Sequence, residues 1–254
     1  MSNLKDRVAV ITGATGGIGF QVAKRLGEDG YTVVLNGIDD DAGADRIKQL
    51  TAAGITAEYY GFDVTNEDEV NSNINKIGEK YGKIDVLINN AGGLGGRSRF
   101  EDMTTEFYRF VMALNLDSTF FASRAAIPFL KKSDKASIIN YTSIAGWNAG
   151  GPGAGIYGTS KAAVHAITRA LAKDLAEYGI RVNAVSPGTI DTKFHAQIKS
   201  TKPEVFASWK NNILLGRLGQ PEEVASVISF LVSDDAAFLT AETIQVGGGQ
   251  GLGI

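Results

Sequence analysis

The sequence contains no cysteine and only two histidines in 254 residues. Without cysteine the protein has no disulfide, no thiolate nucleophile and no thiolate metal ligand. The histidines, His165 and His195, show no metal-ligand spacing with the carboxylates around them, so we expect no catalytic metal. Ser143 lacks the Gly-x-Ser-x-Gly setting of a hydrolase nucleophile, which argues against a Ser-His-Asp hydrolase.

Charge of one sign and long apolar runs are also scarce. The formal net charge is -3, and no run of like charges is longer than the three residues Asp39 to Asp41. A nucleic-acid-binding surface would need concentrated basic residues, so we expect a small-molecule ligand instead. No apolar stretch has the length of a signal-peptide core or of a membrane span. These absences predict a cytoplasmic protein with no membrane or nucleic-acid partner.

Short strand-like segments alternate with helical ones along the chain. The seven strand-like segments, rich in β-branched residues, are 7–12, 31–36, 56–64, 83–91, 136–143, 180–188 and 241–249. The segments between them carry apolar residues at helical spacing, as with Val164, Ile167 and Leu171. The alternation predicts an α/β fold with a seven-stranded parallel sheet covered by helices on both faces, the doubly wound arrangement.

The whole chain, residues 1–254, is expected to form a single domain, because no linker, repeat or low-complexity segment interrupts it. Residues 188–219 interrupt the alternation of strands and helices, because they show weak helical patterns and no strand. They follow the carboxyl end of a strand, where ligands bind in open α/β sheets, so we expect a substrate lid there. A pair of packing helices is the alternative, and the sequence leaves both open.

A glycine-rich turn, "TGATGGIG" at residues 12–19, joins the first strand to a helix expected to begin near Ile18. Gly13 permits a tight turn, Gly17 a close backbone approach, and Gly19 close packing of the helix on the strand. The helix N-terminus offers free N–H groups and positive potential to a pyrophosphate. The turn lacks the Gly-Lys-Ser/Thr of a P-loop. Its place between strand and helix predicts a dinucleotide site of the Rossmann type.

Tyr157 and Lys161 lie four residues apart near the start of an apolar helix, after the Gly- and Pro-rich residues 149–155. Residues at i and i+4 share a helical face, so the phenol and the ammonium can approach each other. Lowering the pKa of a phenol from about 10 to about 7 takes about 4 kcal/mol. A unit charge at about 4 Å supplies about that much at an effective dielectric constant of about 20. We therefore expect Lys161 to lower the pKa of Tyr157, a general acid/base beside a nicotinamide.

Over nearly its whole length the chain resembles the short-chain dehydrogenase/reductase family. Besides the glycine turn, the motifs in family order are "DV" at 63–64, "NNAG" at 89–92, "YGTSK" at 157–161 and "SPGTIDT" at 186–192. The resemblance implies a single-domain Rossmann fold and an NAD(P)-dependent oxidoreductase. It also implies a homo-oligomer, a tetramer or a dimer, built through the apolar helices around 105–130 and 158–177. Their alternative role is only to cover the sheet.

The resemblance implies a catalytic set of four residues: Asn115, Ser143, Tyr157 and Lys161. Ser143 ends the fifth predicted strand, where its hydroxyl can polarise the substrate oxygen. By similarity Asn115 would hold a proton-relay water bonded to Lys161. Each of the four residues also has a common structural explanation: a tyrosine at the edge of the core, a lysine in solvent, a serine at a strand end and an asparagine in a helix. Their occurrence together with a dinucleotide turn favours catalysis.

Cofactor contacts are implied in the same way. Asp63 and Val64 would hold the adenine, residues 89–92 would line the ribose that Lys161 grips, and Ile190 and Thr192 would face the nicotinamide amide. The full expected set is Gly13, Thr15, Gly17, Ile18, Gly19, Asp63, Val64, Asn89, Ala91, Gly92, Tyr157, Lys161, Pro187, Gly188, Ile190 and Thr192.

The choice between NAD and NADP depends on the end of the second predicted strand. An acid there binds the ribose hydroxyls of NAD, whereas an Arg or Lys accepts the 2′-phosphate of NADP. These positions hold Gly37 and Ile38, so neither determinant is present. Asp39 to Asp41 would repel a phosphate, and the glycine turn contains no basic residue. We therefore expect NAD as the cofactor, with NADP as the alternative.

The expected reaction interconverts a secondary alcohol and a ketone. One alternative is an NADPH-dependent 3-oxoacyl thioester reductase. Another is a sugar or polyol dehydrogenase, favoured by four polar residues of the expected lid, Lys193, His195, Gln197 and Lys199. A dinucleotide sensor without activity is the alternative from a different class, and the intact catalytic set argues against it. His165 lies among Ala and Val and is expected to pack in its helix.

Overall fold

Seven strands form one parallel sheet. A computed structural model of the chain describes residues 6–192, 195–201 and 203–251. The strands are β1 (Val8–Ile11), β2 (Thr32–Gly37), β3 (Ala57–Gly61), β4 (Val86–Asn89), β5 (Ser137–Tyr141), β6 (Arg181–Pro187) and β7 (Thr243–Val246). Their spatial order is β3-β2-β1-β4-β5-β6-β7, and all neighbours run parallel. The expected seven-stranded doubly wound fold is confirmed, with strands shorter than the sequence patterns.

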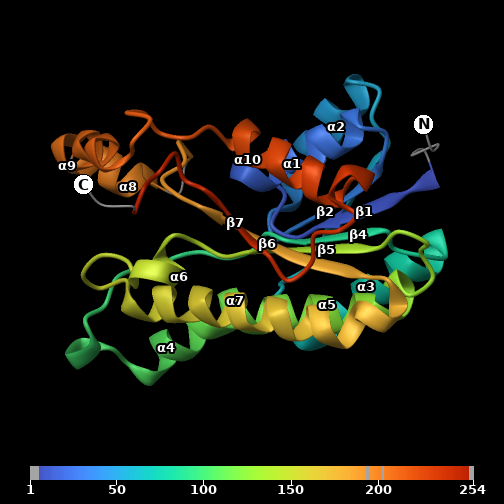
Figure 1. Ribbon diagram of the computed structural model, residues 1–254, viewed down its shortest axis with the longest axis horizontal. Helices are drawn as coiled ribbons and strands as arrows, with labels where there is room; N and C mark the ends of the chain where they lie inside the picture. The colour runs from blue at the N-terminus through green and yellow to red at the C-terminus, as the bar shows by residue number, and fades with distance from the viewer. Residues whose placement is uncertain (1–5, 193–194, 202, 252–254) are drawn as a thin grey trace.

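Helices cover both faces of this sheet (Figure 1). They are α1 (Gly17–Glu28), α2 (Asp40–Ala52), α3 (Glu67–Tyr81), α4 (Thr105–Met112), α5 (Ser118–Leu130), α6 (Ala145–Asn148), α7 (Gly155–Leu175), α8 (Ala196–Thr201), α9 (Pro203–Ser208) and α10 (Pro221–Val232). Helices α1, α2 and α10 lie on one face, and α3, α5 and α7 lie on the other. In the part of the chain that the structure describes, no helix has the length and apolarity needed to cross a bilayer.

The central strands are buried on both faces, which explains their unbroken apolar sequences. In β1, Ala9 and Ile11 pack into the core beneath α1 and α10, whereas Val8 and Val10 pack into the core beneath α3 and α5. Successive side chains of a strand point to opposite faces, so each strand contributes to both cores. Two apolar layers therefore hold the strand ends, and with them the loops that form the site, in fixed positions.

The strand order reverses between β1 and β4. The chain runs outward from β1 through β2 to β3, then returns to place β4 on the other side of β1. Loops leaving β1 and β4 at their carboxyl ends must therefore turn apart, which opens a crevice between them. The glycine turn after β1 and the "NNAG" segment at the end of β4 both lie at this point.

Residues 188–219 leave the sheet and return to it at nearly the same place. Gly219 N donates to Thr189 O at 3.1 Å, and Asp191 N donates to Gly219 O at 2.8 Å. Between these points the chain forms α8 and α9, which lie beyond one end of the sheet, apart from the covering layers (Figure 1). Of the polar residues expected in this segment, Lys193 and the side chain of Gln197 lie outside what the structure describes.

Candidate active site

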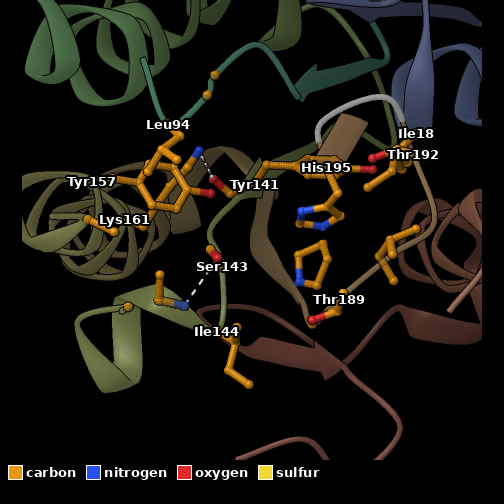
Figure 2. A pocket seen from close by; sticks show the side chains of 18 of the residues that line it. Ile18, Leu94, Tyr141, Ser143, Ile144, Tyr157, Lys161, Thr189, Thr192 and His195 are labelled. Carbon is orange, nitrogen blue, oxygen red and sulfur yellow. Dashed lines mark hydrogen bonds between the residues drawn. The ribbon is translucent and has the colours of Figure 1, made fainter. Parts of the chain in front are cut away.

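A cavity of about 910 Å³ lies at the carboxyl end of the sheet. Its walls come from the glycine turn, the loop after β4, the end of β5, the start of α7 and the segment after β6. Figure 2 shows Tyr157, Ser143 and His195 reaching into this space from different elements. The described part of the cavity wall includes twelve of the expected site residues: Gly13, Gly17, Ile18, Gly19, Gly92, Ser143, Tyr157, Lys161, Pro187, Gly188, Ile190 and Thr192.

Glycines at three positions of the turn allow it to pack closely against the neighbouring loop and to leave the start of α1 open. Gly13 has a φ of 62°, and a Cβ there would lie 2.9 Å from Ala91 Cα. A Cβ at Gly19 would lie 2.5 Å from Asn90 Nδ2, so helix α1 could not approach the sheet as it does. At Gly17 a Cβ would meet no atom within 4 Å. Helix α1 begins there, with N–H groups available to a pyrophosphate, so this end fits a dinucleotide.

Asn90 ties the loop after β4 to the glycine turn. Its Nδ2 donates to Thr12 O and to Gly13 O, both at 2.9 Å. Thr12 Oγ1 in turn accepts from the backbone N–H groups of Asn90 and Ala91. Asn90 also lines the cavity. The sequence analysis did not select Asn90 individually, although its place inside the "NNAG" motif was a signal.

The side chain of Asn89, a residue expected to line the ribose, points into the core. The side chain is buried and its Nδ2 donates to Ser123 Oγ at 2.9 Å and to Asn140 Oδ1 at 2.8 Å. Adjacent residues at a strand end point to opposite sides. Asn89 therefore holds β4, β5 and α5 together, and the cavity wall is formed by its neighbour Asn90.

Asn115 lies in a five-residue π-helical segment, Ala113–Asp117, between α4 and α5. It is fully buried, and its Nδ2 donates to Gly93 O and to Val111 O, both at 2.9 Å. Its Oδ1 accepts from Gly93 N at 3.0 Å. A Cβ at Gly92 would lie 2.7 Å from Asn115 Oδ1 and 2.9 Å from Lys161 Nζ. Asn115 therefore clamps the loop beside Lys161. The expected relay water stays a prediction.

Tyr157 and Lys161 lie in the first turns of α7, as their spacing predicts. Lys161 Nζ is buried, donates to Tyr141 O at 2.9 Å and lies 5.9 Å from the centroid of the Tyr157 ring. Burial lowers the pKa of Lys161 to about 8. The hydroxyl of Ser143, two residues after the end of β5, hydrogen-bonds to Tyr157.

The electrostatics of Tyr157 differ from the sequence expectation. Burial raises the pKa of Tyr157, and the hydrogen bond from Ser143 only partly opposes that rise. Lys161, which was expected to dominate, is not among the causes of this shift, and its ammonium donates to the Tyr141 carbonyl. Burial of both groups is therefore the main influence on their pKa values.

Gly37 is the last residue of β2 and packs closely against Thr15. A side chain at Gly37 would collide with the side chain of Thr15, so an acid that binds the ribose hydroxyls could not be placed there unless Thr15 shifted. Ile38 is 81% exposed. Arg46 Nε donates to Thr15 O at 3.0 Å and brings a cation to this end.

Asp63 and Val64 follow β3 on the same side of the sheet as Gly37. The Asp63 carboxylate accepts from Thr65 N and Thr65 Oγ1, both at 2.8 Å, and Val64 is buried. Thr15, Asp63, Val64, Asn89, Ala91 and Asn115 do not belong to the described cavity wall. Their assigned roles stay predictions.

Gln250 is a pocket residue that the sequence analysis missed. Its Oε1 accepts from Thr189 N at 2.7 Å and its Nε2 donates to Thr189 Oγ1 at 2.9 Å. The two residues are 61 positions apart, and no local pattern relates them. The clamp holds the turn after β6, where Gly188 and Ile190 face the cavity.

Beyond Thr192, the described part of the segment 188–219 adds four residues to the cavity wall: His195, Ile198, Trp209 and Asn212. The ring of His195 packs edge-on against Trp209, with centroids 5.2 Å apart. His165, by contrast, packs within the fold as expected. It is buried against Trp147, and its Nδ1 lies 3.2 Å from Thr243 Oγ1.

Comparison with known proteins settles the family. A family model described as enoyl-(acyl carrier protein) reductase, of the short-chain alcohol dehydrogenase type, matches residues 13–250. The chain belongs to the short-chain dehydrogenase/reductase family. It is therefore an NAD(P)-dependent oxidoreductase that acts on alcohols and ketones.

This short-chain dehydrogenase/reductase has relatives with diverse names. It is 36% identical to the 3-oxoacyl-[acyl-carrier-protein] reductase of Thermotoga maritima over 97% of this chain and 98% of that protein. It is 35% identical to the cyclopentanol dehydrogenase of Comamonas testosteroni, with 98% of both chains covered. Among solved structures, an NADH-dependent reductase of alginate metabolism superposes with a TM-score of 0.89 at 37% identity, covering 98% of this chain and 99% of that one.

Proposed function

We propose that the enzyme interconverts a secondary alcohol and a ketone, with Tyr157 as the general acid/base. The supporting observation is the hydrogen bond between the Tyr157 and Ser143 hydroxyls in the cavity that also contains the glycine turn. A bound nicotinamide supplies or accepts a hydride at the substrate carbon. In reduction Tyr157 donates a proton to the carbonyl oxygen, and in oxidation it accepts the proton of the alcohol.

The surroundings of Tyr157 affect its two roles, as proton donor in reduction and as proton acceptor in oxidation, in different ways. Because burial raises its pKa, Tyr157 keeps its proton at neutral pH, as a proton donor requires. Alcohol oxidation needs the phenolate, which is favoured by the Ser143 hydroxyl, the Lys161 ammonium and the positive end of α7. Ser143 can also donate to the substrate oxygen as negative charge develops on it.

The segment 188–219 acts as the substrate lid in this proposal. The support is its closed base at Thr189, Asp191 and Gly219 and its contribution of His195 and Trp209 to the cavity wall. A segment held at one narrow base can move as a unit without disturbing the sheet.

NAD(H) is the preferred cofactor in this proposal. Asp39, the N-cap residue of α2, places an acidic side chain next to the end of β2, where a 2′-phosphate would have to lie. The opposing cation, Arg46, donates to Thr15 O and has the Asp45 carboxylate 3.5 Å from its Nη1. Titration of the protein with NADH and NADPH, followed by nucleotide fluorescence, should give the tighter binding for NADH.

We also propose a homo-oligomer built through α4 and α5. Three large side chains on these helices are exposed: Tyr108, Phe110 and Phe120. Aromatic residues are enriched at protein interfaces, so their exposure here supports the proposal.

The decisive experiment follows the absorbance of NADH and NADPH against a panel of ketones, sugars and an acetoacetyl thioester. We expect turnover in the panel, and we expect Tyr157→Phe to reduce kcat by about 100- to 10,000-fold, the usual contribution of general acid–base catalysis. Nucleotide affinity should stay within a few-fold. Tyr178→Phe, at an exposed tyrosine outside the cavity, is the matched control.

The results of this experiment distinguish the candidate functions. Turnover unchanged in Tyr157→Phe would remove Tyr157 from the mechanism. Tight nucleotide binding without turnover of any compound would favour the sensor instead. Preference for the thioester would favour the second candidate, a 3-oxoacyl thioester reductase, which the similarity to the Thermotoga maritima protein supports.

A further inference from the structure

The described cavity wall contains basic side chains but no acidic ones. Of the described residues that line it, none is Asp or Glu, whereas Arg97, Lys161 and His195 all contribute. The chain as a whole has a net charge of -3 and carries 28 acidic residues. Acidic side chains are thus abundant in the protein and lacking in the described wall.

Arg97 lies at the reaction end of the cavity rather than at the pyrophosphate end. Its Nη1 donates to Pro152 O at 3.0 Å, and Ser98 N donates to Gly153 O at 3.0 Å. Residues 150–153 directly precede α7, which carries Tyr157. These hydrogen bonds link Arg97 to the loop before the catalytic helix. The glycine turn forms a different part of the cavity wall, where the N-terminus of α1 is available to phosphate.

Most of the guanidinium of Arg97 is available to a ligand. Arginine has five N–H donors, and the hydrogen bond to Pro152 uses only one. Among the described residues, no carboxylate forms an ion pair with Arg97. A fork of parallel N–H donors matches the two oxygens of a carboxylate.

His195 faces the same space from the segment after β6 (Figure 2). The pKa of His195 is lowered, first by burial and further by the charge of Arg97, so the two basic groups act on each other. Asp191 opposes this shift, and its carboxylate is also 3.4 Å from Lys199 Nζ. A carboxylate bound beside Arg97 would offset both effects and favour the charged form of His195, which could then donate to it.

We infer that the substrate is a ketone or secondary alcohol that also carries a carboxylate, which binds Arg97 with His195 on its other side. This inference rests on the proposed function, because it assigns a substrate class to the same site. The reacting carbon lies at Ser143 and Tyr157, and the carboxylate lies toward the loop at 150–153. Neutral ketones of the same shape lack the charge-assisted hydrogen bonds and bind more weakly.

The test compares acids with their neutral esters. Acetoacetate, levulinate and 5-oxohexanoate are each paired with the methyl ester, and kcat/KM is measured with whichever reduced nucleotide binds more tightly. We expect the acid to be preferred in at least one pair. Arg97→Gln should lower that acid-to-ester ratio by about 10- to 100-fold, the usual range for a hydrogen bond to a charged group. Arg97→Lys should lower it less.

Arg99→Gln is the matched control, since Arg99 is an exposed arginine two residues away that is not part of the described wall. It should leave the ratio unchanged. Ratios near one for every pair, or ratios that Arg97→Gln does not alter, would overturn the inference while leaving the oxidoreductase proposal intact.

Calorimetric binding of the same acids and esters to the nucleotide-loaded protein tests the anion site without turnover. Acid binding that is lost in Arg97→Gln would support the anion site even if no compound reacted, in which case only the proposed function would fail. No stronger binding of any acid than of its ester would overturn the inference.

Discussion

At the residue scale, the polar groups that carry chemistry here are buried, and burial governs their ionisation. Lys161 is 3% exposed, and removal from water lowers its pKa to about 8, whereas the same effect raises the pKa of Tyr157. Both shifts disfavour the charged form. A substrate or nucleotide that brings charge into the cavity therefore changes the proton affinity of both groups.

Because the pKa of His165 is lowered in the folded protein, we expect the protein to lose stability at acidic pH. Burial, with the charges of Arg169 and Lys161, lowers the pKa of His165 from 6.5 to about 4. Between these pH values the unfolded chain binds the proton and the folded one does not, so stability falls as pH drops through this window. The loss is at most about 3 kcal/mol for a shift of this size.

Urea unfolding from neutral pH down to pH 4 tests this expectation. His165→Gln removes the titrating group and should flatten the acid limb of the stability curve. His195→Gln, at a histidine that is only partly buried, should keep most of it. Parallel curves for the wild type and His165→Gln would show that other groups cause the loss.

At the scale of elements, one irregular segment positions the site. An α-helix running straight from α4 into α5 would place Asn115 differently, whereas the π-helical segment lets its amide bond Gly93 and Val111. Such segments are frequent at functional sites. The loop after β4 therefore depends on a helix more than 20 residues away along the chain.

Asn115→Leu should both destabilise the fold and weaken nucleotide binding. It removes three hydrogen bonds from a fully buried site, for a loss of about 2–4 kcal/mol. Asn183→Leu is the matched control, because Asn183 is equally buried and bonds Leu239 and Glu242 outside the described cavity wall. Urea unfolding should show a lower free energy of unfolding for both variants. Only Asn115→Leu should weaken NADH binding. Equal NADH affinity in the two would contradict the positioning role.

At the scale of the whole molecule, the exposed aromatic residues of α4 and α5 lead us to expect a homo-oligomer. Phe110 is 48% exposed and Phe120 is 40% exposed. Introducing like charges into a subunit interface opposes association, so Phe110→Glu combined with Phe120→Glu should yield a smaller species by light scattering. Ile38→Glu, at an exposed apolar residue just after β2, should leave the mass unchanged. A monomeric wild type would end this proposal.

The sheet, the glycine turn and the Tyr157–Lys161 pair could be predicted from the amino-acid sequence alone. These features follow from local periodicity and from residues a few positions apart, which the chain displays directly. Which side chains reach the cavity depends instead on tertiary packing. Arg97 beside Pro152 and Gln250 on Thr189 are contacts between segments far apart in sequence. Packing also makes burial, rather than Lys161, the dominant influence on the pKa of Tyr157, because desolvation depends on everything packed around a group.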